Sequence, residues 1–266
     1  MSEGFTASHR GGSGSPLVLL HGFTDTWRTW ELVLPALERR HDVLAVTLAG
    51  HAGGPPLGED VDGATLADAV ERALDEAGLE TAHIVGNSLG GYLAFALAAR
   101  GRARSVVAFA PAGGWTPGDK SHNQTLDFFT MTQDLVAAAV PHADEIAASE
   151  EGRRRATEFI TTNFEHLPPE LVAHQIRGVA GCEGAAALIG YARREGYSVD
   201  PEQVTCPVRI VWGTADRILR WPDAAARYRE EWFPNADWVV LDGIGHCPQL
   251  DVPDETAELI LGFASG

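Results

Sequence analysis

Short runs of apolar residues alternate with amphipathic stretches along most of this chain. The apolar runs have the length of buried strands and lie at 17–20, 43–48, 82–85, 105–110, 208–212 and 238–241. Helical patterns separate many of these runs, at 27–39, 65–77, 89–100 and 254–263. Continuous apolar runs separated by helices indicate parallel strands that are buried on both faces. The pattern therefore predicts an α/β fold with a mostly parallel sheet and helices on both of its faces.

The alternation stops between residues 115 and 200, where no strand pattern occurs. Four helical patches punctuated by prolines fill this stretch, at about 122–140, 150–164, 169–179 and 183–194. The stretch is too long for a loop of a compact domain, and it follows the C-terminal end of a strand, where α/β sheets bind ligands. We therefore expect residues 1–114 and 201–266 to form the core domain and residues 115–200 to form a helical cap.

The segment Gly86-Asn87-Ser88-Leu89-Gly90 lies between a predicted strand and a predicted helix. A Gly-x-Ser-x-Gly sequence in that position forms the nucleophile elbow, a tight turn that strains the serine backbone. The serine oxygen then projects at the positive N-terminal end of a helix. Ser88 could instead be an ordinary helix N-cap, but the strand–turn–helix context favours a nucleophile.

A serine hydroxyl needs a base within hydrogen-bond reach, and that base needs an acid to orient it. The strand 208–212 runs into a loop that carries Asp216, and the strand 238–241 runs into a loop that carries His246. Parallel strands would bring both side chains to the edge where Ser88 lies. Asp242 is the alternative acid, although it is close in sequence to His246.

The first apolar run is followed by His21-Gly22-Phe23-Thr24. Acyl transfer places negative charge on one oxygen, which preorganised backbone N–H groups stabilise. The N–H groups of Phe23 and Leu89 are the candidate donors of this oxyanion hole. His21 is expected to brace the loop by hydrogen bonds rather than to act as an acid or base.

Together these motifs resemble the α/β-hydrolase family, in particular its branch of capped, single-domain serine esterases and carbon–carbon hydrolases. The similarity covers nearly the whole chain outside the cap and includes Gly245-His246 with Pro248. The chain order of serine, aspartate and histidine is the one found in that family. The resemblance implies that Ser88 is the nucleophile, His246 the general acid/base and Asp216 the orienting acid, without a metal or organic cofactor.

Several residues bear on which reaction the resemblance implies. Cys247 stands where carbon–carbon hydrolases usually have an aromatic residue, whereas Asn87 is similar to that branch. The aspartate that family members often carry after the fourth strand is missing from the segment 47–53, which we assign no catalytic role. A serine at position 88 argues against haloalkane dehalogenase and epoxide hydrolase chemistry, because those enzymes form an ester with a carboxylate nucleophile.

The sequence thus predicts a serine hydrolase that cleaves a small or medium carboxylic ester or lactone through an acyl-enzyme. One alternative is a carbon–carbon bond hydrolase acting on a ring-cleavage dienone or β-diketone. The other is a non-catalytic protein that uses the hydrolase fold to bind a ligand. The candidate pocket residues are His21, Thr24, Trp27, Asn87, Trp115, Phe128, Phe129 and Cys247. Trp27 could instead pack the first helix against the sheet.

The charge of the chain limits the kinds of partner that it can bind. The 266 residues include 20 basic and 37 acidic side chains, which gives a formal net charge of −17. Such a surface repels nucleic acid and anionic membranes, so we expect a small-molecule substrate and neither of those partners. The three cysteines form no disulfide framework or metal-ligand pattern, and residues 1–16 carry no apolar signal core. We therefore expect a cytoplasmic protein, and the sequence does not indicate whether it is a monomer or a homodimer.

Overall fold

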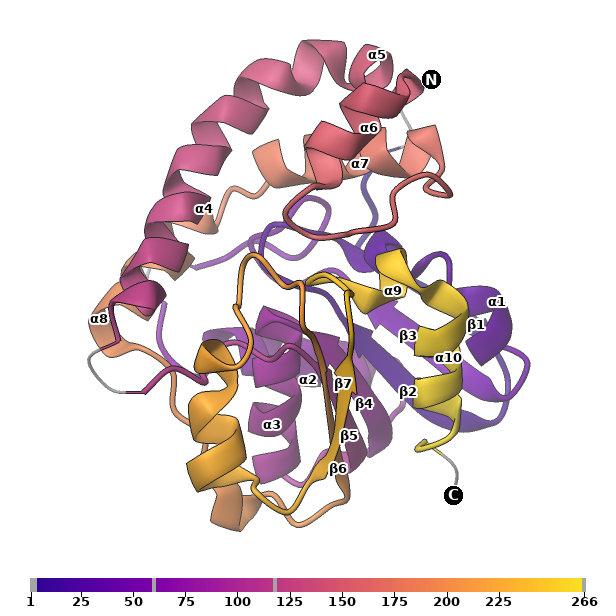
Figure 1. Ribbon diagram of the computed structural model, residues 1–266. Helices are drawn as coiled ribbons and strands as arrows, with labels where there is room; N and C mark the ends of the chain where they lie inside the picture. Colours follow the sequence, from indigo (N-terminus) through magenta and orange to yellow (C-terminus); the bar gives the residue numbers. More distant parts are fainter. Residues whose placement is uncertain (1–3, 59–60, 117–118, 265–266) are drawn as a thin grey trace.

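A seven-stranded sheet forms the centre of the molecule (Figure 1). The computed structural model describes residues 4–58, 61–116 and 119–264. The strands are β1 (Ser8–Gly12), β2 (Ser15–Leu20), β3 (His41–Val46), β4 (Ala82–Asn87), β5 (Ala103–Phe109), β6 (Val208–Gly213) and β7 (Asp237–Leu241). Their order is β1-β3-β2-β4-β5-β6-β7, and only the β1–β3 pair is antiparallel. The predicted α/β class with a mostly parallel sheet is confirmed.

The edge strand β1 lies in a stretch whose composition gave no strand signal. Its residues are polar or glycine, and none of them is fully buried. The strand is held by backbone pairing to β3, with Ser8 opposite Val46 and Gly12 opposite Asp42. An edge strand can form without an apolar face because the ladder of backbone hydrogen bonds does not depend on side-chain type.

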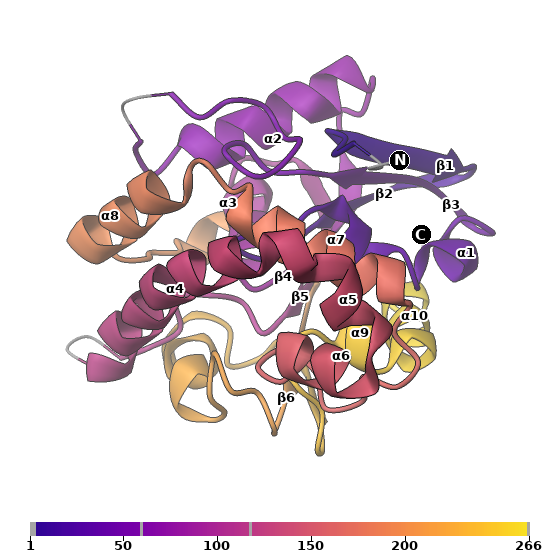
Figure 2. The same ribbon diagram turned by 90° about the horizontal axis from the view of Figure 1, so that it is seen from above.

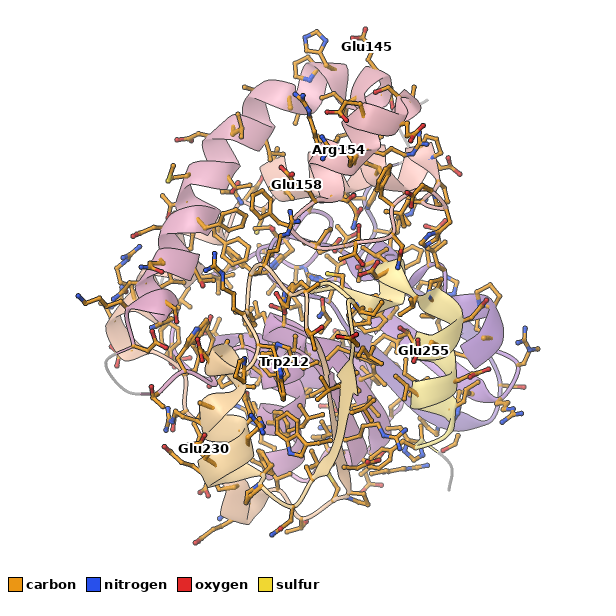
Figure 3. All side chains as sticks on the ribbon, in the orientation of Figure 1. Glu145, Arg154, Glu158, Trp212, Glu230 and Glu255 are labelled. Carbon is orange, nitrogen blue, oxygen red and sulfur yellow. The ribbon has the colours of Figure 1, made fainter. Side chains whose placement is uncertain are left out.

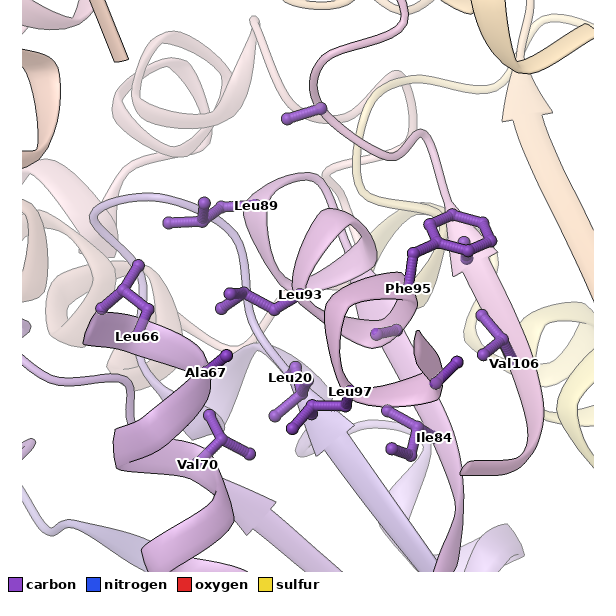
Figure 4. Close-up of a cluster of buried hydrophobic side chains, with 14 of the residues drawn as sticks. Leu20, Leu66, Ala67, Val70, Ile84, Leu89, Leu93, Phe95, Leu97 and Val106 are labelled. Atoms are coloured by element: carbon purple, nitrogen blue, oxygen red, sulfur yellow. The ribbon is translucent and has the colours of Figure 1, made fainter. Parts of the chain in front are cut away.

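Two hydrophobic layers cover the two faces of the sheet. On one face, α2 (Thr65–Glu76) and α3 (Leu89–Ala99) pack on strand residues such as Leu20, Ile84 and Val106 (Figure 4). On the other face, α1 (Leu34–Leu37) and α10 (Pro253–Leu261) pack on the alternate strand residues. These alternate residues are Leu17, Leu19, Val43, Ala45, Val85, Val107, Phe109 and Val211. Strands buried on both faces explain the continuous apolar runs in the sequence.

Two predicted helices are shorter than their hydrophobic pattern suggests. The stretch 27–39 contains a 3₁₀ turn, η1 (Trp27–Trp30), and the short helix α1, which begins one residue before Pro35. The predicted helix 150–164 ends at Thr157, whose carbonyl accepts from the N–H groups of Ile160 and Thr161. Proline and local carbonyl capping therefore set these boundaries, and periodicity alone does not show them.

In the described part of the chain between β5 and β6 there are five α-helices, and we call this set the insertion. They are α4 (Lys120–Ala139), α5 (Ala143–Ala148), α6 (Glu150–Thr157), α7 (Pro169–Ala180) and α8 (Ala185–Glu195), with a 3₁₀ turn η2 (Val140–His142) between α4 and α5. Figures 1 and 2 show the insertion over the edge at which the parallel strands end. The described part of residues 115–200 contains no strand.

Short elements complete the second part of the chain. They are η3 (Pro201–Gln203), η4 (Asp223–Ala225), the π-helical turn η5 (Tyr228–Trp232) and the short helix α9 (Pro248–Asp251). The predicted last helix, 254–263, is α10, and α9 precedes it directly after the loop that carries His246. Of the helices that the structure describes, none has both the length and the apolar character needed to cross a membrane.

Candidate active site

Ser88 sits in a strained turn between β4 and α3. Its φ of 55° and ψ of −117° are unusual for a residue with a side chain. The turn is possible because Gly86 and Gly90 flank the serine: a Cβ on Gly86 would lie 2.1 Å from the carbonyl oxygen of Gly90, and a Cβ on Gly90 would lie 2.2 Å from that of Leu20. Ser88 occupies the N-cap position of α3, yet its side chain makes no capping hydrogen bond. The Ser88 hydroxyl therefore does not cap the N-terminus of α3.

Asp216 and His246 form a buried pair. The Nδ1 atom of His246 lies 2.7 Å from Oδ2 of Asp216, and both side chains are almost fully buried. The other carboxylate oxygen, Oδ1, accepts from the backbone N–H groups of Ile218 and Leu219, each at 2.8 Å. These bonds fix the position of the Asp216 carboxylate. Because Asp216 contacts His246 through Nδ1, it does not occupy Nε2 of the imidazole. The alternative acid, Asp242, is exposed and accepts from the hydroxyl of Thr214.

The amide of Asn87, the last residue of β4, braces the His246 loop. Its Nδ2 donates to the carbonyl oxygens of His246 at 3.0 Å and Phe109 at 3.2 Å. Its Oδ1 accepts from Nε2 of Gln249 at 3.2 Å and from the thiol of Cys247 at 3.3 Å. All of these bonds are buried, so Asn87 holds the backbone of His246 beside the nucleophile elbow.

Asp251 braces the same loop from the other side. Its Oδ2 accepts from the N–H of Gly245 at 2.6 Å, directly before His246. Its carboxylate also accepts from the backbone N–H groups of Thr162 and Asn163, which belong to the loop after α6. One buried carboxylate thus joins the His246 loop to the insertion.

The loop after β2 lies against the nucleophile. A Cβ on Gly22 would be only 3.2 Å from Cβ of Ser88. His21 is fully buried, with Nδ1 2.7 Å from the carbonyl oxygen of Gly22 and Nε2 accepting from the N–H of Leu48 at 2.9 Å. Burial holds the pKa of His21 well below its usual range, and His51 lowers it further. His21 is therefore a neutral brace of this loop.

The two predicted oxyanion donors flank Ser88. Phe23 lies on the braced loop, and Leu89 is the first residue of α3. The N–H groups of a helix's first turn have no partner within the helix, so the N–H of Leu89 is available to a ligand. Thr24 supports Phe23 through a bond from its hydroxyl to the Phe23 carbonyl at 2.7 Å, and it adopts a positive φ of 67°.

Ser88 lines two cavities between the sheet and the insertion. The wide cavity has a volume of about 1050 Å³ and is also lined by His246. Glu145, Arg154 and Glu158 line it from the insertion, where Figure 3 shows them. The narrow cavity has a volume of about 60 Å³ and a mostly apolar lining. Ser88 therefore stands where a wide and a narrow space meet.

The predicted pocket residues fall into four groups. Thr24, Asn87, Phe128 and Cys247 line the wide cavity, Trp115 lines the narrow one, and Phe129 lines both. His21 and Trp27 line neither of these two cavities in the part of the chain that the structure describes. Trp27 instead stacks on His9 of β1 and donates from Nε1 to the hydroxyl of Thr6. Trp27 therefore packs at the edge of the sheet, against His9 of β1 and Thr6 before it.

Asp25 and Gln175 are among the residues of the wide cavity that lie outside the predicted set. Asp25 lies two residues after Phe23, and Gln175 lies on α7. Burial raises the pKa of Asp25 to about 6. Asp25 could have been found from the sequence because it directly follows the oxyanion loop. Gln175 could not, because the sequence does not indicate which face of α7 is turned toward the cavity.

Cys247 is a wall residue and not a second nucleophile. Burial, together with the negative charges of Asp25, Asp216 and Asp251, holds the pKa of its thiol well above the usual range. A protonated thiol is a poor nucleophile. Within the described ranges, no group of three or more histidine, cysteine or acidic side chains is arranged to hold a metal ion.

Comparisons with known proteins agree with this fold. A sequence model described as the alpha/beta hydrolase family matches residues 17–259. A Mycobacterium tuberculosis (strain ATCC 25618 / H37Rv) protein named epoxide hydrolase EphH is 35% identical over 201 residues, which cover 75% of this chain and 94% of that protein. A 2-hydroxymuconate semialdehyde hydrolase of Pseudomonas sp. (strain CF600) is 27% identical over 278 residues, covering 95% and 89%. The solved structure of the esterase RhEst1 from Rhodococcus sp. ECU1013 has a TM-score of 0.72 at 23% identity and covers 97% of this chain and 94% of its own.

Proposed function

This chain belongs to the alpha/beta hydrolase family, and we propose that it hydrolyses a small or medium carboxylic ester or lactone with Ser88 as the nucleophile. One observation carries the proposal: the strained serine lines the same cavity as His246, whose other ring nitrogen is paired with Asp216. A serine, a histidine and an acid in this arrangement are the parts needed for acyl transfer.

The proposed reaction begins when Nε2 of His246 takes the proton of the Ser88 hydroxyl as the oxygen attacks the ester carbonyl. The N–H groups of Phe23 and Leu89 stabilise the resulting oxyanion, and loss of one such donor typically costs about 3 kcal/mol of barrier. The imidazolium of His246, stabilised by Asp216, then protonates the departing alcohol. A water activated by the same imidazole attacks the acyl-enzyme, so that the acid is released and Ser88 is regenerated.

The two cavities support a substrate with two unequal parts. Because Ser88 lines both, a bound carbonyl would have one substituent in the narrow apolar space and the other in the wide space. Phe23 and Phe129 line both cavities and contact each other edge to face, with ring centroids 5.0 Å apart. We infer that the narrow side takes a short apolar chain and that the wide side takes the larger part of the ester or lactone.

Carbon–carbon bond hydrolysis of a dienone or β-diketone is the second candidate. It is favoured by the relative named 2-hydroxymuconate semialdehyde hydrolase, which aligns with nearly the whole chain. The Asn87 amide, which is similar to that branch, is used here to brace His246 and Gln249. This activity would appear as bleaching of a coloured dienolate substrate with little turnover of simple esters.

The relative named epoxide hydrolase makes an epoxide a further substrate to test. Attack of a serine oxygen on an epoxide would leave an ether on Ser88, which water activated by His246 could not readily cleave. A carboxylate nucleophile avoids this outcome because it forms an ester. We therefore expect no turnover of styrene oxide by this chain.

We place the reaction in the cytoplasm and propose that its partners are small molecules, not nucleic acid or membranes. All three cysteines, Cys182, Cys206 and Cys247, are free thiols, which suits a reducing compartment. The formal net charge of −17 opposes binding to polyanions.

Hydrolysis of p-nitrophenyl esters from acetate to decanoate tests the proposed function. We expect turnover by the wild type, with an optimum chain length set by the cavities, and at least a 10³-fold lower kcat for Ser88→Ala at unchanged folding. Thr24→Ser, which keeps a hydroxyl on the oxyanion loop, serves as a matched control and should keep most of the activity. A folded Ser88→Ala protein with wild-type activity would end the proposed mechanism.

A further inference from the structure

Among the polar side chains that line the wide cavity, two that the proposed reaction does not use lie close to each other. Asp25 comes from the loop after β2 and Gln175 from α7 of the insertion, and both line the cavity together with Ser88 and His246. Nε2 of Gln175 lies 3.5 Å from Oδ2 of Asp25, which is at the outer limit for a hydrogen bond. The two side chains therefore form one polar group beside the reacting residues, joined by a weak contact.

Gln175 has an unused acceptor in this group. The residue is only 9% exposed, and its Oε1 is buried with no hydrogen-bond partner among the residues that the structure describes. Exchanging the amide oxygen and nitrogen would not help, because the oxygen would then face the carboxylate of Asp25. Leaving a buried acceptor unsatisfied costs about 1–3 kcal/mol, so the site favours a ligand that brings a donor.

The carboxylate of Asp25 can also accept further hydrogen bonds. Its Oδ1 accepts from the N–H of Thr26 at 2.8 Å, and the side chain of Thr29 is a further hydrogen-bond partner. Within the described residues, its partners include no arginine or lysine. Burial raises the pKa of Asp25 to about 6 because these donors do not fully replace the lost water. Near pH 7.5 the group is a carboxylate, which can accept more hydrogen bonds than it receives.

We propose that Asp25 and Gln175 form a subsite that binds a hydroxyl group on the larger part of the substrate. A hydroxyl can donate to the Asp25 carboxylate and accept from Nε2 of Gln175, and a turn of the Gln175 side chain toward the cavity would let its buried Oε1 accept as well. The remaining walls near α7 include Val172, Ile176 and Val179, so the polar pair would select a hydroxyl at one position along an otherwise apolar chain. The preferred ester or lactone is then hydroxylated, and a plain aliphatic compound is a poorer ligand.

The inference rests on the proposed function for the place of the reacting carbonyl, but binding can be measured without turnover. The probes are methyl ketones of six to ten carbons, each with and without a terminal hydroxyl, titrated calorimetrically into the protein at pH 7.5. The ketone stands in for the ester carbonyl, and the chain length moves the hydroxyl through the wide cavity. We expect the hydroxylated ketone to bind about tenfold more tightly at one or two chain lengths, as one hydrogen bond to a charged group allows.

Substitutions locate the subsite. Gln175→Leu should remove the preference for the hydroxylated ketones while keeping the affinity for the plain ketones. Asp25→Asn keeps the shape of the side chain and should reduce the same preference. It serves as the test if Gln175→Leu does not fold. Gln133→Leu is the matched control, because Gln133 lines the same cavity from α4. It should keep the preference.

The subsite is refuted if the wild type shows no preference at any chain length, or if the preference survives both Gln175→Leu and Asp25→Asn. If only Gln133→Leu lost the preference, the hydroxyl would bind near α4 and not at Asp25 and Gln175, which would also overturn the proposal. A ketone with a terminal ammonium that binds more tightly than the hydroxylated one would overturn the assignment to a hydroxyl. Preference in binding without any p-nitrophenyl ester turnover would support the subsite and contradict the ester hydrolase, whereas turnover without preference would do the reverse.

Discussion

The hydroxyl of Ser88 is available for chemistry because its backbone keeps it from capping α3. A serine directly before a helix usually has an extended conformation, and its oxygen accepts from an N–H two or three residues further on. Ser88 has φ 55° and ψ −117° instead and makes no such bond. The strained backbone therefore forgoes a local stabilising contact at a residue that lines both cavities.

At residue scale, Asp216→Asn tests how the histidine is oriented. In the wild type, Oδ1 of Asp216 accepts two backbone N–H groups and Oδ2 faces Nδ1 of His246. An asparagine would keep its oxygen on the two N–H groups, so its NH₂ would face Nδ1 and leave the proton on Nε2. That tautomer cannot take the serine proton, and we expect kcat to fall roughly 10⁴-fold, measured on the best p-nitrophenyl ester.

Asp242→Asn is the control for this substitution. Asp242 is the other acid of the region, but it is exposed and bonds to Thr214. The control should keep a rate near that of the wild type. A large loss for Asp242→Asn together with a near-normal rate for Asp216→Asn would reverse the assignment.

At the scale of single elements, the turn between β4 and α3 has no room for a side chain at its first glycine. In Gly86→Ala the new Cβ would lie 2.1 Å from the carbonyl oxygen of Gly90, so the strand or the helix must move. We expect a loss of at least about 3 kcal/mol in the free energy of unfolding and loss of activity, measured by urea denaturation and ester hydrolysis.

Gly190→Ala provides the matched comparison. Gly190 lies inside α8, where an added Cβ would meet only the end of the Arg194 side chain at 3.5 Å. Alanine is the better helix former, so this change should be neutral or stabilise the protein by up to about 1 kcal/mol. Equal losses for the two substitutions would show that the close approach in the elbow is not what requires glycine.

Sequence patterns predict those elements whose packing leaves a mark on residue type. The strands β2 to β7 were predicted because burial on both faces requires apolar side chains, and the elbow because its turn requires glycine at 86 and 90. The strand β1 was missed because an edge ladder is made by backbone groups. Asp251 and Gln249 were missed as braces of His246, because their role depends on the path of loops that periodicity does not describe.

At the scale of the whole molecule, the insertion and the His246 loop share one core. Cys247 and Leu250 pack with buried residues of α5 and α7, such as Ala147 and Leu171. Thr26 of the loop after β2 is hydrogen-bonded to Nε2 of His174 on α7 at 3.0 Å. The insertion therefore contacts both the base loop and the oxyanion loop, so changes in its position will alter the site.

Stability as a function of pH tests the burial of two groups that join these parts. The pKa of Asp25 is raised to about 6 by burial, so the folded state binds its proton more tightly than the unfolded state between about pH 4 and 6. Stability from this group is present at low pH and is lost as the pH rises through that window. Asp25→Asn removes this titration, so its free energy of unfolding relative to wild type should increase by about 2 kcal/mol from pH 4 to pH 6.5.

The contribution of His174 to the free energy of unfolding should change with pH in the opposite direction. Burial, with Arg28 and Arg177 nearby, lowers the pKa of His174 to about 4, so the unfolded state binds its proton more tightly between about pH 4 and 6.5. Stability is then lost as the pH falls through that window, and His174→Gln should gain relative to wild type toward pH 4. Urea denaturation of both variants and the wild type at several pH values gives the two difference curves. Parallel curves would contradict the account of how these groups are buried.

The most direct test of the central claim is covalent labelling of the nucleophile with an alkyl fluorophosphonate, followed by peptide mapping by mass spectrometry. We predict one adduct per chain, on the peptide that contains Ser88, with ester hydrolysis lost in proportion to labelling and no adduct on Ser88→Ala. A chain that hydrolyses esters but carries no label on Ser88, or that stays active when Ser88 is fully labelled, would contradict the account.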